Sequence, residues 1–248
     1  MPWSRRTTTT ISTSPISCGD AVTPTPELAE RYGGVMGRIA DACRDAARRP
    51  DDVTVIVVTK FHPAALIRDL VELGVRHVGE NRHQEAVAKR DECRDLTSLT
   101  WHFVGQLQSN KAKAVLDYAS VIHSVDRASL VGALAKTERD CDVFLEVNLT
   151  DDPGRGGGAP DELDALAERV LQVPSLRLRG VMAVAPLGEP PRSAFARLRI
   201  LSERVQRLAP AATDISAGMS SDFAEAIAEG ATHLRIGTAI TGKRPAAP

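Results

Sequence analysis

A chain of 248 residues is long enough for one large domain or two small ones. Its formal net charge of −1 excludes a global attraction to nucleic acid or anionic lipid, and no apolar stretch reaches the ~18 residues that a membrane span needs. The four cysteines have neither metal-ligand nor redox spacing, so they predict free thiols, a reducing compartment and a cytoplasmic protein.

The N-terminal segment differs in composition from the rest of the chain. Residues 1–25 are rich in Thr, Ser and Pro without periodicity, which predicts a disordered extension. From Pro26 onward, apolar residues fall at helical spacing and predict a helix over residues 26–48. Gly33 and Gly34 lie inside this helix, and we expect them to bend it. The remaining residues, 26–248, are expected to form one domain.

Beyond this helix the chain alternates between two kinds of segment. Strand-like runs are predicted near residues 53–59, 76–79, 101–105, 119–123, 142–148, 178–184, 212–216 and 233–237. Helix-like runs are predicted between them, near residues 63–73, 82–95, 109–116, 127–139, 160–172, 190–208 and 221–229. This α/β alternation predicts a single (β/α)8 TIM barrel preceded by an extra helix. A doubly wound open sheet is the alternative, and it is disfavoured because no Gly-x-Gly-x-x-Gly follows the first strand.

Lys60 stands directly after the apolar run of residues 53–59. It is the only lysine in the chain that follows a continuous apolar strand. The end of a barrel strand is where this architecture places its chemistry. Apolar surroundings lower the pKa of an ammonium group, which suits an amine that attacks an aldehyde. Lys60 is therefore the first candidate for a functional residue.

The segment of residues 215–222 lies between the seventh strand and its helix. Gly218 permits a tight turn, and Ser220 and Ser221 supply hydroxyl groups beside the start of the helix, which suits an anion site. A simpler interpretation, compatible with the first, is a capping box formed by Asp222 and Glu225.

A second segment, residues 232–242, follows the eighth strand. Arg235 and Gly237 are two residues apart on that strand, so they point to the same side. Gly237 and Thr238 then offer an N–H and a hydroxyl at the strand end. Phosphate commonly binds after strands seven and eight of such barrels, so the two segments together predict a phosphate site. A buried Arg235 needs a partner, which could be the ligand or an internal carboxylate such as Glu146.

Other polar residues at strand ends give weaker signals. Glu80, Asn81, His102, Gln108 and Asn110 are each more typical of structural roles when taken singly. The histidines have no mutual spacing that indicates a metal site, and the sequence contains neither a Ser/His/Asp elbow nor a nucleic-acid-binding module.

Taken in order along the chain, these motifs match a known family. The matching segments are residues 58–60, 79–82, 101–111, 179–183, 216–222 and 235–239. On them, the chain resembles the pyridoxal 5′-phosphate homeostasis proteins, which are similar to the barrel domain of alanine racemase. The resemblance runs from about residue 26 to residue 242.

The resemblance implies a barrel of the alanine racemase N-terminal type that holds pyridoxal 5′-phosphate as a Schiff base on Lys60. It implies phosphate contacts from the positions of Ser216, Ser220, Gly237 and Thr238. It also implies that Arg235 faces the pyridine nitrogen. The positions expected at the cofactor are Lys60, Asn81, Ser216, Gly218, Ser220, Arg235, Gly237 and Thr238.

Turnover by this chain is not expected. An arginine at the pyridine nitrogen keeps that nitrogen unprotonated, which weakens the ring as an electron sink. Alanine racemase takes a second base, a tyrosine, from an additional domain, and neither Tyr32 nor Tyr118 matches it. The expected function is a monomeric carrier of pyridoxal phosphate that could transiently meet apo-enzymes. The alternatives are an amino-acid racemase and a barrel enzyme that uses Lys60 as a Schiff-base catalyst for another phosphorylated aldehyde or ketone.

Overall fold

The computed structural model describes residues 24–152 and 154–243. The predicted disordered extension falls largely on residues 1–23, outside the described residues. Thr25, at its predicted end, is instead the N-cap of the first helix, α1 (Pro26–Asp45), and its side chain accepts a hydrogen bond from the Leu28 N–H. The chain therefore enters its first helix through a specific cap.

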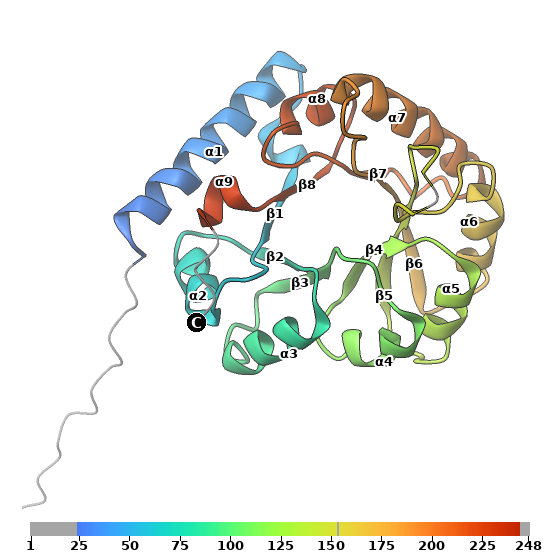
Figure 1. Ribbon diagram of the computed structural model, residues 1–248, viewed down its shortest axis with the longest axis horizontal. Helices are drawn as coiled ribbons and strands as arrows, with labels where there is room; N and C mark the ends of the chain where they lie inside the picture. Colours follow the sequence, from blue (N-terminus) through green and yellow to red (C-terminus); the bar gives the residue numbers. More distant parts are fainter. Residues whose placement is uncertain (1–23, 153, 244–248) are drawn as a thin grey trace, which may run out of the picture.

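A closed barrel of parallel strands follows this helix, as predicted (Figure 1). The strands are β1 (Thr54–Val58), β2 (His77–Glu80), β3 (Thr100–Phe103), β4 (Val121–Val125), β5 (Cys141–Glu146), β6 (Leu176–Met182), β7 (Asp214–Ser216) and β8 (His233–Ile236). Each pairs with its neighbours along the chain, and β1 closes on β8 with Ile56 opposite Arg235. β4 is buried throughout, in keeping with strands covered on both faces.

Helices surround the barrel (Figure 1). They are α2 (Ala64–Glu72), α3 (His83–Glu92), α4 (Ala112–Val115), α5 (Ala128–Ala135), α6 (Leu163–Leu171), α7 (Pro191–Leu208), α8 (Phe223–Ala228) and α9 (Thr238–Thr241). Short 3₁₀ turns cover Pro50–Asp52 and Ser109–Lys111. The helix predicted over residues 109–116 is therefore split into a 3₁₀ turn and α4, and α9 was not predicted.

The helix α1 lies against α8 and α9 and covers the side of the barrel between α8 and α2 (Figure 1). Arg31 donates to the Ile240 carbonyl at 2.8 Å, and Arg48 donates to the Ala231 carbonyl at 2.7 Å. α1 continues as a helix through Gly33 and Gly34, so neither glycine ends it. Both glycines are exposed, and a β-carbon at either would touch nothing.

The core is aliphatic, as the low aromatic content requires. Its largest buried side chains include Ile56, Leu70 and Leu145. Cys43, Cys93 and Cys141 are buried free thiols, which agrees with the prediction, while Cys18 lies outside the described residues. Over the described part of the chain, no helix combines the length and apolar character that a bilayer crossing demands.

Candidate functional site

A pocket of about 410 Å³ opens where the carboxyl ends of the barrel strands meet. Its lining comes from the segments that follow β1, β2, β3, β6, β7 and β8. The lining residues are Val58, Lys60, Asn81, Val104, Val184, Met219, Ser220, Ser221, Arg235, Gly237 and Thr238. The pocket thus brings together Lys60, the hydroxyls of the loop after β7 and Arg235, which lie up to 175 positions apart in sequence.

Lys60 lies two residues beyond the end of β1 and directly after the buried run of residues 56–59. The chain then turns sharply, because Phe61 has a positive φ of 68°. The N–H of Phe61 donates to Glu85 Oε2 at 3.0 Å, which holds the turn against α3. Within residues 24–152 and 154–243, no carboxylate forms an ion pair with the Lys60 ammonium. The amine is therefore presented to the pocket by a fixed turn.

Asn81 follows β2 and lines the same pocket. Its Oδ1 atom is buried and has no hydrogen-bond partner among the described residues. Leaving a buried acceptor unsatisfied costs free energy, so such an atom indicates a ligand that would donate to it. Gly105, after β3, packs directly on Asn81: a β-carbon at Gly105 would lie 2.4 Å from the Asn81 carbonyl oxygen. The backbone of Asn81 is thus held in position by contact with Gly105.

Ser220, Gly237 and Thr238 form the polar wall of the pocket. The Ser220 hydroxyl accepts a hydrogen bond from the Ala239 N–H at 3.3 Å, which ties the loop after β7 to the segment after β8. Ser220 and Thr238 carry hydroxyl groups that can donate to phosphate oxygens, and Gly237 leaves room beside them. This wall is the arrangement that the sequence predicted for an anion.

Arg235 is a further polar residue of the pocket lining and is buried within the barrel. Its Nη1 donates to Ser216 Oγ at 2.6 Å and its Nη2 donates to the Ala183 carbonyl at 2.9 Å. Burial lowers the pKa of Arg235 to about 10, and the negative charges of Glu146 and Asp222 oppose that shift. Glu146 is not its direct ion-pair partner, because the recorded partners of the Arg235 guanidinium are Ser216 and Ala183, and Glu146 Oε2 has no hydrogen-bond partner among the described residues.

Two predicted site residues do not line the pocket. Ser216 is fully buried on β7, and its hydroxyl contacts Arg235 and His123. Gly218 has a φ of +91°, and a β-carbon there would lie 2.8 Å from Ala226 Cβ, so the turn itself requires glycine. Direct phosphate contact by Ser216 is therefore revised: Ser216 lies beneath the site and holds Arg235.

The predicted capping box at α8 is also absent. Asp222 is the N-cap of α8 but makes no side-chain hydrogen bond to the helix. Its Oδ1 instead accepts the N–H of Met219 at 2.6 Å, back toward the pocket. The carboxylate therefore shapes the loop that carries Ser220.

The sequence reasoning missed a row of histidines behind the site. His77, His102 and His123 are hydrogen-bonded in series and end on Ser216. They are 25 and 21 positions apart, so no local spacing reveals them. The usable signal was a polar ring inside otherwise apolar strands, as in Val121–Val125. Among the described residues, no three or more His, Cys, Asp or Glu side chains are grouped so that they could hold a metal ion.

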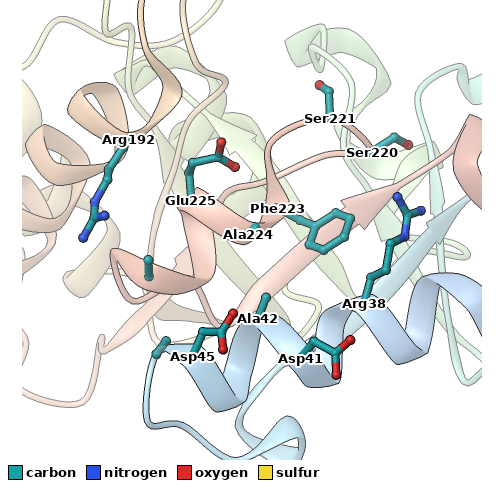
Figure 2. A pocket seen from close by; sticks show the side chains of 12 residues that line it. Arg38, Asp41, Ala42, Asp45, Arg192, Ser220, Ser221, Phe223, Ala224 and Glu225 are labelled. Carbon is teal, nitrogen blue, oxygen red and sulfur yellow. The ribbon is translucent and has the colours of Figure 1, made fainter.

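A larger cavity of about 750 Å³ lies between α1 and α8 (Figure 2). Ser220 and Ser221 line both cavities, so only the loop after β7 separates them. The wider cavity is lined by charges of both signs, among them Arg38 and Asp41, and Arg38 lies 5.6 Å over the Phe223 ring. It has no lysine in its lining, so it does not reproduce the chemistry of the smaller pocket.

The chain was compared with protein families and with solved structures. Residues 37–245 match the family model of the alanine racemase N-terminal domain. A pyridoxal phosphate homeostasis protein of Pseudomonas aeruginosa is 42% identical over 224 residues, covering 88% of this chain and 96% of the relative. A homologous protein of the same description from Aquifex aeolicus is 38% identical over 223 residues, covering 87% and 97%.

Solved structures share the fold. PipY of Synechococcus elongatus, solved with pyridoxal phosphate bound, is 38% identical with a TM-score of 0.76, covering 87% of this chain and all of PipY. Alanine racemase of Streptomyces coelicolor has a TM-score of 0.67 at 18% identity, covering 87% of this chain and 58% of the racemase. This last likeness concerns the barrel alone.

Proposed function

The chain belongs to the pyridoxal phosphate homeostasis proteins, and from this membership we propose that it holds pyridoxal 5′-phosphate covalently on Lys60 and releases it again. The observation that carries the proposal is the convergence of Lys60, the Asn81 acceptor, the hydroxyl wall and Arg235 on one pocket. The unsatisfied Asn81 Oδ1 supports a ligand with a hydrogen-bond donor there.

When bound, pyridoxal 5′-phosphate supplies an aldehyde that reacts reversibly with a primary amine. Lys60 supplies that amine. Ser220 and Thr238 bind the phosphate, with Gly237 admitting it close to the backbone. Arg235 would donate toward the ring nitrogen, and because it only donates, that nitrogen would be held without a proton.

We propose that the protein stores and hands over its cofactor without turning over a substrate. Of the described residues that line the pocket, Lys60 and Arg235 are the ones with ionisable side chains. A racemase needs a second base opposite the lysine, and neither tyrosine lines the pocket: Tyr32 belongs to α1, and Tyr118 is partly buried before β4 with its pKa raised by desolvation. We propose a monomer that meets apo-enzymes only transiently.

Borohydride reduction of the loaded protein, followed by peptide mass spectrometry, tests the site. We expect the label on the peptide that contains Lys60, no label in Lys60→Arg, and full label in the exposed control Lys111→Arg. A principal label on another lysine would contradict the proposal.

A second assay separates the carrier from the racemase alternative. Loaded protein is incubated with a panel of L-amino acids, and D-isomers are measured over time. We expect no sustained formation of D-isomers. Continuing turnover that Lys60→Arg abolishes would instead assign the racemase function.

A further inference from the structure

Five side chains form an unbroken row of hydrogen bonds through the barrel. His77 Nδ1 lies 3.0 Å from His102 Nε2, and His102 Nδ1 lies 2.9 Å from His123 Nε2. His123 Nδ1 lies 2.8 Å from Ser216 Oγ, which accepts from Arg235 Nη1 at 2.6 Å. The row takes one residue each from β2, β3, β4, β7 and β8.

The two ends of the row face different surroundings. Arg235 lines the pocket at the carboxyl ends of the strands. His77 is half-buried and lines a separate cavity of about 510 Å³, together with Thr54 and Thr100 from the starts of β1 and β3. The members between the ends are almost fully buried: His102 is 2% exposed, and His123 and Ser216 are 0% exposed. The row thus connects the two ends of the barrel through its interior.

The hydrogen bond donated by Arg235 determines which ring nitrogen carries the proton in each histidine of the row. Arg235 only donates, so it occupies one lone pair of Ser216 Oγ. In the described structure, His123 Nδ1 is the one other polar atom bonded to that hydroxyl, so the Ser216 proton must point to it. His123 then carries its proton on Nε2 and donates to His102, and His102 donates from Nε2 to His77. All three rings are Nε2–H tautomers, and every hydrogen bond donates away from the arginine.

We propose that His77, His102 and His123 are positioning residues for Arg235, and that protonation of His77 is transmitted along the row to the arginine at the cofactor. This inference rests on the proposed function, in which Arg235 donates to the pyridine nitrogen. The His123 ring is fixed for this task, because it stacks on Phe144 with centroids 4.5 Å apart and planes 11° apart.

A proton added to His77 Nδ1 conflicts with the donor on His102 Nε2. The conflict is relieved when His102 and His123 each change from the Nε2–H to the Nδ1–H tautomer, while His77 keeps a proton on both nitrogens. This leaves His123 Nδ1–H donating to Ser216. The Ser216 hydroxyl proton then has no acceptor among the described residues, so Ser216 must turn or lose its bond to Arg235. Protonation at one end of the barrel therefore alters the hydrogen bonding of Arg235 at the other.

As the pH falls, His77 is the first of the three histidines to be protonated. Burial lowers the pKa of all three rings, and it lowers those of His102 and His123 well below their ordinary value. The ionisable groups around His77, besides His102, line the same cavity: Asp52, Asp142, Arg177, Arg179, Asp214 and His233. Arg177 pairs with Asp142 at 2.6 Å and Arg179 pairs with Asp214 at 2.8 Å, so most of these charges are already matched.

Nuclear magnetic resonance of the histidine rings tests the row without any cofactor. In ¹⁵N-labelled protein near pH 8, we expect Nε2–H signals for His77, His102 and His123. As the pH is lowered, His102 and His123 should move toward Nδ1–H in step with protonation of His77. The variant His77→Gln keeps an acceptor but cannot titrate, so its other two rings should stay unchanged. An Nδ1–H tautomer of His102 or His123 near pH 8 would overturn the proposal.

The visible absorbance of the loaded protein tests the coupling to the cofactor. We expect a step in the pH profile at the same pH at which His77 titrates by resonance. This step should be lost in His77→Gln and retained in His83→Gln, a control on α3 outside the row. Identical profiles in wild type and His77→Gln would overturn the coupling. If the wild type failed to bind pyridoxal phosphate at all, the proposed function would fall, while the resonance experiment would still judge the row.

Discussion

Lys89 and Glu80 form a buried ion pair directly below the turn that carries Lys60. Lys89 Nζ lies 2.7 Å from Glu80 Oε1, and the two side chains are 7% and 0% exposed. The same ammonium donates to the Thr59 carbonyl at 2.8 Å, and the Thr59 hydroxyl donates to Glu80 at 2.6 Å. Burial raises the pKa of Glu80, while Lys89 and the Thr59 hydrogen bond act against that shift. The ion pair therefore holds Thr59 at the end of β1 and also supplies a cation for the buried Glu80 carboxylate.

Lys89→Met should destabilise the protein strongly, because it leaves the Glu80 carboxylate buried without its cation. Removing one partner of a buried pair costs about 3–5 kcal/mol. Urea unfolding at pH 8 measures the loss.

The double variant Glu80→Gln/Lys89→Met should recover part of the lost stability, since no unpaired charge remains. The exposed pair of Arg44 and Asp41 provides the control: Arg44→Met should change stability by less than about 1 kcal/mol. Equal losses for Lys89→Met and Arg44→Met would contradict the supporting role.

Gly105→Ala should disturb the pocket through Asn81. The new β-carbon would lie 2.8 Å from Asn81 Cα as well as 2.4 Å from its carbonyl oxygen, and backbone atoms cannot move aside cheaply. We expect a loss of about 1–3 kcal/mol in unfolding free energy and weaker cofactor binding, measured by urea unfolding and absorbance titration. The matched control is Gly132→Ala in α5, where a β-carbon touches nothing. That variant should gain about 0.5–1 kcal/mol and bind normally.

Ser220→Ala and Thr238→Val should reveal which ligand group the hydroxyl wall binds. Each removes one hydrogen bond to a charged acceptor, worth about 1.5–3 kcal/mol or roughly 10- to 100-fold in affinity. Competition titrations should show this loss for pyridoxal 5′-phosphate and little change for pyridoxal, which has no phosphate. A similar loss for both ligands would place the phosphate elsewhere.

Much of the barrel could be predicted because its strands are short apolar runs between polar helices. The predicted run over residues 53–59 became β1 (Thr54–Val58), and Lys60 lies at its exit as expected. The period of side chains along β8 correctly put Arg235 and Gly237 on one side, since both line the pocket. The local sequence pattern predicted the position of a side chain correctly where that position depends only on one strand and the loop that follows it.

Two site predictions failed because another contact competes for the side chain, one between distant strands and one within the loop after β7. Ser216 belongs to the motif that was expected to bind phosphate. Its hydroxyl is instead hydrogen-bonded beneath the pocket to Arg235 and His123, which lie 19 and 93 positions away. Asp222 and Glu225 have capping-box spacing, yet the carboxylate of Asp222 bonds backward to Met219. Spacing along the chain carries no information about which side chain from another strand will compete for a donor.

Glu146→Gln should change how stability depends on pH. Glu146 lies at the end of β5, and burial raises its pKa to about 7 from an ordinary value of 4.5, assisted by the charge of Asp126 and opposed by Arg235. A carboxyl whose pKa is raised on folding stabilises the fold fully below pH 4.5, and this contribution is lost as the pH rises through about 7. The neutral amide of glutamine cannot ionise, so its contribution stays constant.

The measurable quantity is the unfolding free energy of Glu146→Gln minus that of wild type. Between pH 5 and pH 8.5 we expect it to rise in favour of the variant by on the order of 2 kcal/mol, a value reduced for the partial solvent access of the carboxylate. The exposed Glu168→Gln in α6 controls for loss of one negative charge, and its difference from wild type should stay flat. Parallel stability curves for wild type and Glu146→Gln would mean that Glu146 ionises as freely in the folded chain as in the unfolded one.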